Sequence, residues 1–324
     1  MSVEEFLEEW NNSSETVLVH TSGSTGEPKP MQVEKCRMLN SARITCDFLG
    51  LHEGDTALLC MSLDYIAGKM MVVRALERGL QLISVEPSGH PLAVTQRGQS
   101  PCVDFAAMVP MQVYNSLQVP EERERLMQIR HLIIGGGAID EALAAELKSF
   151  PNAVWSTYGM TETLSHIALR RLSGSDASDY YTPFPSVHLS LSDEGCLVID
   201  APEVCPETLV TNDIGELRPD GTFRILGRKD NVICSGGLKI QAEELERLLR
   251  PHLHIPYLIS KRPDEKFGEI VVLLTEGSVD EARTVCERIL PKYHQPRAYI
   301  HIDKIPMTAT GKPARKQAEL FAKG

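Results

Sequence analysis

The segment HTSGSTGEPKP, residues 20–30, places hydroxyl side chains, glycines and a lysine directly after an apolar run. Its hydroxyl donors are Thr21, Ser22, Ser24 and Thr25. Gly23 and Gly26 lack a Cβ, so backbone N–H groups can approach an anion, and Lys29 adds a positive charge. The spacing is not that of a Walker loop, because Pro28 stands where that motif needs its second glycine. These residues predict a polyphosphate-binding loop and leave open a solvated Ser/Thr/Gly loop.

Strands and helices alternate on both sides of this loop. TVLVH, residues 16–20, predicts a strand, and a helix from about residue 34 should end at Gly50. Further strands are predicted at TALLCM (56–61), LQLIS (80–84), VDFAAMV (103–109), RHLIIGGG (130–137) and AVWSTYG (153–159), with helices at 65–79 and 140–150. Such alternation predicts a largely parallel sheet covered by helices.

The pattern changes after about residue 165. Hairpins are predicted at residues 186–200 and 215–226, which turn at Gly195 and Gly221. Helices are expected near residues 242–249, 279–289 and 313–322. We therefore predict an α/β fold with a large N-terminal domain, residues 1–228, that has a mainly parallel sheet and a β-rich subdomain. A small, mobile α+β domain, residues 229–324, should follow.

Composition excludes several classes of protein. The 324 residues are 42% hydrophobic and 24% charged, and the formal net charge of −11 argues against nucleic acid or an anionic membrane as partner. The N-terminus MSVEEFLEEW is acidic and lacks the apolar segment of a secretory signal. The eight cysteines form no C-x-x-C pair, which is typical of reduced thiols. A soluble, cytoplasmic protein is expected.

Six segments together resemble, in order, the motifs of the adenylate-forming superfamily of acyl-CoA synthetases, adenylation domains and luciferases. They are TSGSTGEPK (21–29), GGGAID (135–140), YGMTET (158–163), TNDIGEL (211–217), GRKDNVICSGGLKI (227–240) and PMTATGKPAR (306–315). Taken alone, the glycine clusters at 135–137 and 236–237 are typical of structural turns. The resemblance implies ATP, Mg²⁺ and coenzyme A as cofactors, and a small carboxylic acid as substrate.

The resemblance also assigns roles to individual residues. The β- and γ-phosphates of ATP would be bound by the loop residues Thr21, Ser22, Gly23, Ser24, Thr25, Gly26 and Lys29. Adenine would lie beside Gly136, Gly137, Ala138 and Tyr158. Thr161 would contact the α-phosphate, Glu162 would bind magnesium, and Lys312 would act as the catalytic lysine of adenylation.

The ribose and the thiol have their own implied residues. Asp213, assisted by Arg228, would bind the ribose hydroxyls, and Asp230 would be the hinge of the small domain. The hairpin containing Gly237 would line the path of the thiol. For single residues the alternatives are ordinary: Asp213 capping a turn, or Lys312 as a solvated charge.

Two departures from the family pattern accompany the resemblance. The phosphate loop begins at residue 21, so most of the usual front subdomain is missing, although Met1 resembles a genuine start. Asn212 stands where the family favours glycine. The missing portion would expose part of a sheet, which a second subunit of a homodimer would cover.

The chain most resembles the short o-succinylbenzoate–CoA ligases of menaquinone synthesis. The alternatives are an enzyme that loads another acid onto coenzyme A or a carrier protein, and a degenerate ATP-binding homologue without activity. Within YIAGKMMVVRAL, Tyr65 would stand beside the acyl group. Lys69 lies in an apolar helix and should either pair with Asp64 or Glu86, extend to water, or meet the second carboxylate of the substrate.

Overall fold

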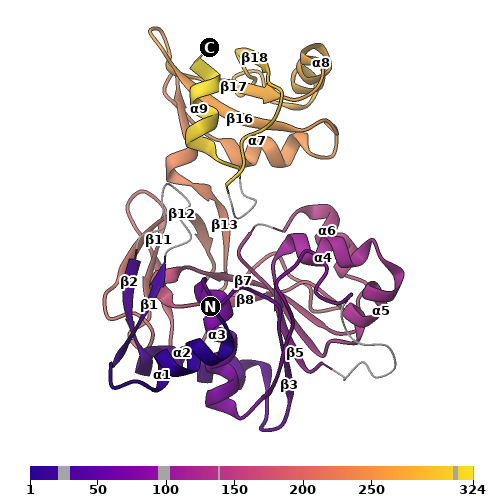
Figure 1. Ribbon diagram of the computed structural model, residues 1–324. Coiled ribbons are helices and arrows are strands. Elements are labelled where there is room, and N and C mark those ends of the chain that lie inside the picture. The colour runs from indigo at the N-terminus through magenta and orange to yellow at the C-terminus, as the bar shows by residue number, and fades with distance from the viewer. Residues whose placement is uncertain (21–29, 94–102, 138, 309–312, 324) are drawn as a thin grey trace. The chain divides into compact units, whose positions relative to one another are not determined.

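The computed structural model describes residues 1–20, 30–93, 103–137, 139–308 and 313–323 (Figure 1). Contacts between Cα atoms divide the chain into two units. Unit 1 comprises residues 1–189, 199–209 and 218–223, and unit 2 comprises residues 190–198, 210–217 and 224–324. The predicted domain boundary between residues 228 and 229 stays a prediction.

Unit 1 is built on a seven-stranded sheet. Its strand order is β4(Gln81–Ser84), β3(Thr56–Leu59), β5(Phe105–Met108), β6(His131–Ile134), β7(Ala153–Gly159), β8(His166–Arg171) and β9(Thr182–Pro183). The strands from β4 to β7 are parallel, whereas β8 is antiparallel to both β7 and β9. The predicted, largely parallel sheet is confirmed.

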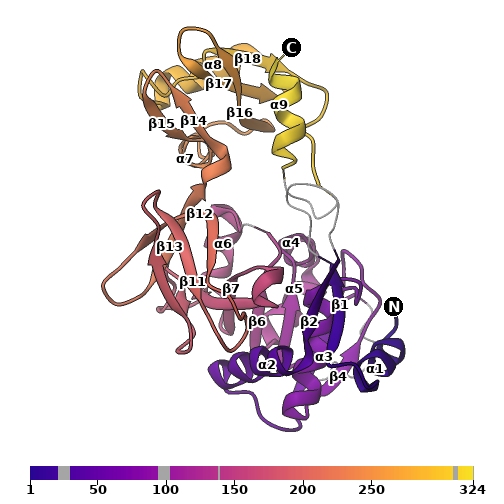
Figure 2. The same ribbon diagram turned by 90° about the vertical axis from the view of Figure 1, so that its left-hand side faces the viewer.

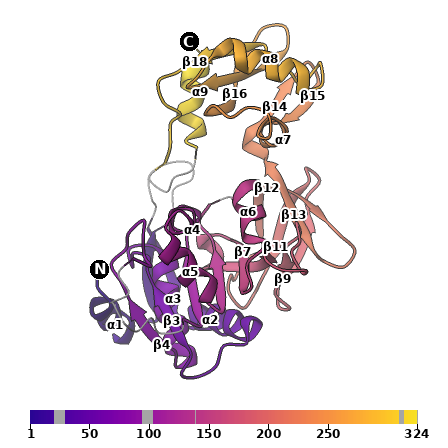
Figure 3. The same ribbon diagram turned by 90° about the vertical axis from the view of Figure 1, so that its right-hand side faces the viewer.

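Helices cover both faces of this sheet (Figure 3), and alternate residues of its strands supply the two cores beneath them. In β5, Phe105 and Ala107 join one core, while Ala106 and Met108 join the other. The first face is covered by α1(Val3–Asn11), α2(Lys35–Leu49) and α3(Ile66–Arg78), and the second by α4(Pro110–Leu117), α5(Pro120–Gln128) and α6(Glu141–Leu147).

Helices α2 and α3 each end at a glycine that permits a left-handed backbone. Gly50 follows α2 with φ 63°, and Gly79 follows α3 with φ 68°. Helix α1, which we did not predict, begins with a capping box in which the Ser2 hydroxyl accepts from the Glu5 N–H and the Glu5 carboxylate accepts from the Ser2 N–H. Phe6 of this helix is fully buried.

A two-stranded antiparallel sheet, β1(Thr16–His20) with β2(Pro30–Glu34), also belongs to unit 1 (Figure 2). Strand β1 confirms the prediction for residues 16–20. Residues 21–29, the predicted phosphate loop, connect these strands in sequence and lie outside the described residues.

Four strands follow in the order β10(His188–Leu191), β11(Cys196–Asp200), β12(Leu209–Leu217) and β13(Phe223–Arg228). The two predicted hairpins are confirmed: Gly195 lies between β10 and β11 with φ 77°, and Gly221 lies between β12 and β13 with φ 82°. Both glycines have the positive φ that tight turns require.

Unit 2 contains a five-stranded sheet and three helices. The strands are β14(Val232–Ser235), β15(Leu238–Gln241), β16(Tyr257–Asp264), β17(Gly268–Thr275) and β18(Ala298–His301). α7(Ala242–Leu249) and α8(Val279–Ile289) pack on one core, and α9(Arg315–Lys323) packs on the other. Successive side chains of β17 point alternately to the two cores. Val271 and Leu273 belong to the first core, and Val272 and Leu274 belong to the second.

Two further observations concern the chain as a whole. Among the described residues, none of the helices has both the length and the apolar character of a membrane crossing. The seven described cysteines are free thiols, in agreement with the prediction of reduced cysteines, and five of them are buried.

Helix α3 packs so tightly at Gly68 that a side chain does not fit. A Cβ at Gly68 would lie 2.3 Å from the carbonyl oxygen of Ser62. Gly68→Ala should therefore lower the free energy of unfolding by about 1–3 kcal/mol, although alanine favours a helix. Urea denaturation measures this, with Ala67→Gly in the same helix as the control for helix propensity. Stabilisation by Gly68→Ala would contradict this packing.

Candidate active site

The YGMTET motif forms a short connection between β7 and β8. Thr161–Thr163 is a single 3-10 turn, in which Thr161 is buried and Glu162 is exposed. The Thr163 hydroxyl accepts from the Met160 N–H at 3.1 Å and lies 2.8 Å from the carbonyl oxygen of Ser165, to which it donates. Because Thr163 is fully buried, its hydroxyl fixes both ends of the turn.

The backbone of this connection is strained. Leu164 has φ 65° and, among the described residues, is the one non-glycine with positive φ. Such a conformation costs on the order of 1–3 kcal/mol and is typical of functional sites. At Gly159 an added Cβ would lie 2.1 Å from the Ser165 carbonyl oxygen, so β7 and β8 approach too closely for any other residue. The close approach of β7 and β8 therefore places Thr161 and Glu162 just after the carboxyl end of β7.

Glu162 has the properties of a magnesium ligand. Its carboxylate is exposed and forms no hydrogen bond or ion pair with another described residue. The described residues contain no cluster of three or more His, Cys, Asp or Glu side chains that would bind a metal by themselves. Mg²⁺ commonly uses one or two carboxylates together with phosphate oxygens, so a single exposed carboxylate fits a metal that arrives with ATP.

The predicted adenine residues lie at neighbouring strand ends. Tyr158 is half-buried near the end of β7, where its ring packs edge-on against Phe223 at a centroid distance of 5.2 Å. The Phe223 ring is stacked on that of Tyr181 at 5.5 Å. These contacts hold the Tyr158 ring and were not predicted, because the three residues are far apart in sequence.

Gly136 and Gly137 follow β6, the strand paired with β7. Gly136 has φ 78°, and the Cβ positions of both glycines would approach only Val109 or Pro110 side chains, at 3.4 Å or more. The backbone here is therefore not crowded by side chains, which suits close approach of a flat ligand. Ala138 lies outside the described residues.

In unit 2 the predicted ribose residues form one polar network. Arg228 Nη1 lies 3.1 Å from Asp213 Oδ1, and Arg228 Nη2 lies 3.2 Å from Asp230 Oδ2. The side-chain amide of Asn212 donates to the same Asp230 oxygen at 3.4 Å. Asn212, noted as a departure from the family, therefore helps to hold the predicted hinge residue.

The hairpin of unit 2 has the predicted two-residue turn. Ser235 pairs with Leu238, and the intervening Gly236 and Gly237 have φ 59° and 86°. Two successive positive φ values are typical of a type I′ turn. No atom lies within 4 Å of a Cβ position at Gly237, so one side of the turn is open.

Arg315 anchors the last motif within unit 2. Its Nη2 donates to Glu246 Oε2 at 2.8 Å, and its Nη1 donates to the Ile259 carbonyl oxygen at 3.1 Å. Lys312 stands three residues earlier and lies outside the described residues. The same holds for Thr21, Ser22, Gly23, Ser24, Thr25, Gly26 and Lys29.

Lys69 forms an internal ion pair, but with a partner that we did not predict. It is buried, and its Nζ lies 3.3 Å from Glu9 Oε2 and 2.9 Å from the Leu18 carbonyl oxygen. The predicted partners Asp64 and Glu86 are wrong, since the Asp64 carboxylate instead pairs with the amino terminus at 3.4 Å. Glu9 belongs to α1, which explains why inspection of the apolar helix alone missed it.

The surroundings of Lys69 favour a structural role over contact with a substrate. Its ammonium also lies 5.3 Å from the Phe6 ring, in addition to Glu9 and Leu18. Tyr65, the other predicted acyl-pocket residue, is the N-cap of α3 and is 46% exposed. Its contact with an acyl group stays a prediction.

Arg74 is a residue of α3 that the sequence analysis did not select. The other two cations of this helix have carboxylate partners: Lys69 pairs with Glu9 and Arg78 with Asp47. Arg74 is 2% exposed and donates to Ser165 Oγ at 2.8 Å, while its Nε has no partner among the described residues. Burial lowers the pKa of Arg74 to about 10, so the guanidinium remains charged at neutral pH.

A family model described as AMP-binding enzyme matches residues 4–222. The chain belongs to the AMP-binding enzyme family. This membership, together with the matching fold, confirms the resemblance inferred from the ordered motifs.

Named relatives of this AMP-binding enzyme share about a quarter of its residues. The 2-succinylbenzoate–CoA ligase of Listeria monocytogenes serotype 4b (strain F2365) is 26% identical, over an alignment that covers 96% of this chain and 71% of that protein. The 2-succinylbenzoate–CoA ligase of Lactococcus lactis subsp. lactis (strain IL1403) is 24% identical, over 93% of this chain and 70% of that protein.

Solved structures agree with the family assignment. An acyl-CoA synthetase (AMP-forming)/AMP-acid ligase II-like protein from Dyadobacter fermentans DSM 18053 is 32% identical, with a TM-score of 0.66, over 99% of this chain and 93% of that one. The o-succinylbenzoate CoA synthetase of Bacillus subtilis, in complex with the acyl-adenylate intermediate, is 24% identical with a TM-score of 0.77, over 93% of this chain and 68% of that one. At 24% identity, the similarity to the Bacillus subtilis structure shows a shared fold alone.

Lys69→Met provides a direct test of the structural role. Removing the ammonium leaves the Glu9 carboxylate and the Leu18 carbonyl without this partner, so the free energy of unfolding should fall by about 1–3 kcal/mol. KM values for ATP and for the acid should stay unchanged. A double-mutant cycle with Glu9→Gln in urea denaturation measures the coupling, and Lys35→Met, a lysine beside Trp10, is the control. A rise in KM for the acid but not for ATP would instead indicate that Lys69 contacts the acid.

Proposed function

We propose that this chain is an AMP-forming acid–CoA ligase, which activates a carboxylic acid with ATP and transfers the acyl group to coenzyme A. The observation that carries the proposal is the clamped turn after β7, which presents Thr161 and the exposed Glu162 next to Tyr158. Family membership and the printed names of the relatives support it. Free cysteines support a cytoplasmic location.

The residues divide the work of adenylation. Tyr158, Gly136 and Gly137 would hold adenine, Asp213 with Arg228 would bind the ribose, and Thr161 would bind the α-phosphate. Bound magnesium would neutralise phosphate charge as pyrophosphate leaves, and Glu162 would hold that ion. These assignments rest on the positions of the family motifs and on the properties of each side chain.

Lys312 and Asp230 have proposed roles in different steps of the mechanism. We propose that Lys312 neutralises charge in the adenylation transition state, and that residues 229–324 move about Asp230 before thioester formation. The network of Asp230 with Arg228 and Asn212 supports a defined position for this hinge. The Gly236-Gly237 turn would then lie along the thiol path.

Arg74 supports a dicarboxylic acid as the substrate. Arg74 has no carboxylate partner within the described part of the chain. A buried guanidinium without such a partner is costly, and an anion from a ligand would reduce that cost. Ser165, to which Arg74 donates, is partly exposed and lies two residues after the Thr161–Thr163 turn. We therefore propose o-succinylbenzoate, whose succinyl carboxylate is activated while its aromatic carboxylate meets Arg74. The printed names of the relatives agree with this acid.

Arg74→Met tests the dicarboxylate assignment. With o-succinylbenzoate, KM in a pyrophosphate-release assay should rise on the order of tenfold or more, because one charged hydrogen-bonding partner is lost. With 4-oxo-4-phenylbutanoate, which lacks the aromatic carboxylate, KM should change little. Arg78→Met, one turn later in α3, is the matched control and should leave both KM values unchanged. An equal change for both acids would contradict the assignment, and no pyrophosphate release with any acid would contradict the ligase.

Lys312→Ala should separate the two half-reactions. Adenylation should slow on the order of 10²-fold, since one electrostatic stabiliser of its transition state is removed. Thioester formation from supplied acyl-adenylate and coenzyme A should be largely preserved. Rapid-quench measurement of each half-reaction distinguishes these rates. Equal losses in both would assign Lys312 to folding or domain movement instead.

A further inference from the structure

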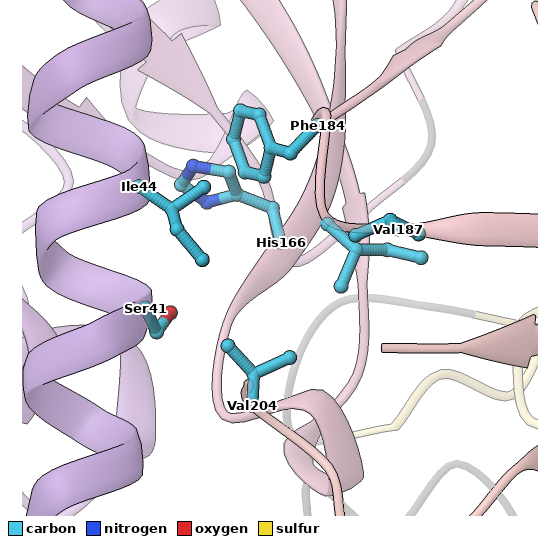
Figure 4. A pocket seen from close by; sticks show the side chains of 7 residues that line it. Ser41, Ile44, His166, Phe184, Val187 and Val204 are labelled. Carbon is cyan, nitrogen blue, oxygen red and sulfur yellow. The ribbon is translucent and has the colours of Figure 1, made fainter. Parts of the chain in front are cut away.

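A chain of hydrogen bonds joins α2 to α3 through the start of β8. Arg74 Nη2 lies 2.8 Å from Ser165 Oγ, and Ser165 Oγ lies 3.1 Å from His166 Nδ1. On the other side of the ring, His166 Nε2 lies 3.2 Å from Thr45 Oγ1, which lies 3.0 Å from the Ser41 carbonyl oxygen. Figure 4 shows the His166 ring between α2, with Ser41 and Ile44, and Phe184.

The donors and acceptors of this chain allow one consistent direction. Ser41 contributes a carbonyl oxygen, so the Thr45 hydroxyl must donate to it and can accept from His166 Nε2–H. Nδ1 of the neutral ring is then the acceptor for the Ser165 hydroxyl hydrogen. The Ser165 oxygen is left to accept from Arg74. Each side chain has the hydrogen that the next one needs.

Burial of three of these side chains means that water cannot easily replace their hydrogen bonds. Thr45 is fully buried, His166 is 6% exposed and Arg74 is 2% exposed. The pocket lined by Ser41, His166 and Phe184 has an interior of about 10 Å³, which is room for about one water molecule. Burial and the nearby Arg74 charge hold the pKa of His166 well below its usual value of 6.5, in keeping with a neutral ring.

We propose that Thr45, His166 and Ser165 are positioning residues that fix the guanidinium of Arg74 toward the second carboxylate of the acid. This inference rests on the proposed dicarboxylate substrate. Preference for a diacid over a monoacid is then set partly by His166 and Thr45, which do not touch the acid and act through Ser165.

The test compares KM for o-succinylbenzoate with KM for 4-oxo-4-phenylbutanoate. Ser165→Ala removes the acceptor of Arg74, and Thr45→Val removes the acceptor of His166 Nε2–H while keeping the side-chain shape. Each should raise KM for the diacid several-fold, up to about tenfold, since a hydrogen bond to a charged group is lost or loosened. KM for the monoacid and for ATP should stay within about twofold. Ser116→Ala, which removes a fully buried hydroxyl that donates to Glu122 at 2.8 Å, is the matched control.

A second pair of variants separates positioning from simple destabilisation. His166→Asn keeps an acceptor near the position of Nδ1, so it should retain more of the diacid preference than His166→Leu. A purely structural role would instead make the preference follow the melting temperature, whichever residue is introduced.

The possible outcomes distinguish this inference from the proposed function. If Arg74→Met abolishes the diacid preference while Ser165→Ala and Thr45→Val retain it, the positioning chain is wrong and the substrate assignment stands. If Arg74→Met itself leaves the preference unchanged, both are overturned. Should Ser165→Ala fail to fold, the result with Thr45→Val decides.

Discussion

The close approach of β7 and β8 at Gly159 is the constraint on which the site of unit 1 depends. The Ser165 carbonyl lies where a side chain of residue 159 would stand, so the chain reverses within a few residues. This reversal forces Leu164 to a positive φ and makes the buried Thr163 hydroxyl the internal support of the turn. It also brings the side chain of Ser165 to Arg74. One steric requirement thus fixes the position of Thr161 and Glu162, which are proposed to bind the nucleotide and its metal, and also that of the Ser165 side chain, which accepts from Arg74.

Local chemistry explains which parts of the structure were predictable. Helix ends at Gly50 and Gly79 and turns at Gly195 and Gly221 depend on backbone freedom at one residue, which is visible in the sequence. The parallel sheet followed from alternation of apolar segments. The predicted site residues Thr161 and Glu162 came from a motif that one short turn contains, and their roles stay predictions. Helix α1 also has a local signal, since Ser2 with Glu5 three residues later is the sequence pattern of a capping box.

Long-range pairing explains what was missed. Glu9 and Lys69 are 60 residues apart, so the helix pattern around Lys69 gave no indication of its partner. The contacts of Arg74 with Ser165, and of His166 with Thr45, join segments 91 and 121 residues apart. Hydroxyl and imidazole side chains inside apolar segments carry little periodic signal. They become informative only when tertiary packing shows which donors face which acceptors.

The Glu9–Lys69 pair has a consequence for association of the protein with itself. The Leu18 N–H donates to Glu9 Oε1 at 3.2 Å, and the Leu18 carbonyl accepts from Lys69 at 2.9 Å. Two side chains therefore occupy hydrogen-bonding positions on β1 that a strand of another molecule would otherwise use. Unprotected strand edges promote intermolecular β-pairing and aggregation. Helix α1 thus protects the free edge of β1. A purification tag or fusion that displaced α1 would expose an aggregation-prone strand directly before the predicted phosphate loop in sequence.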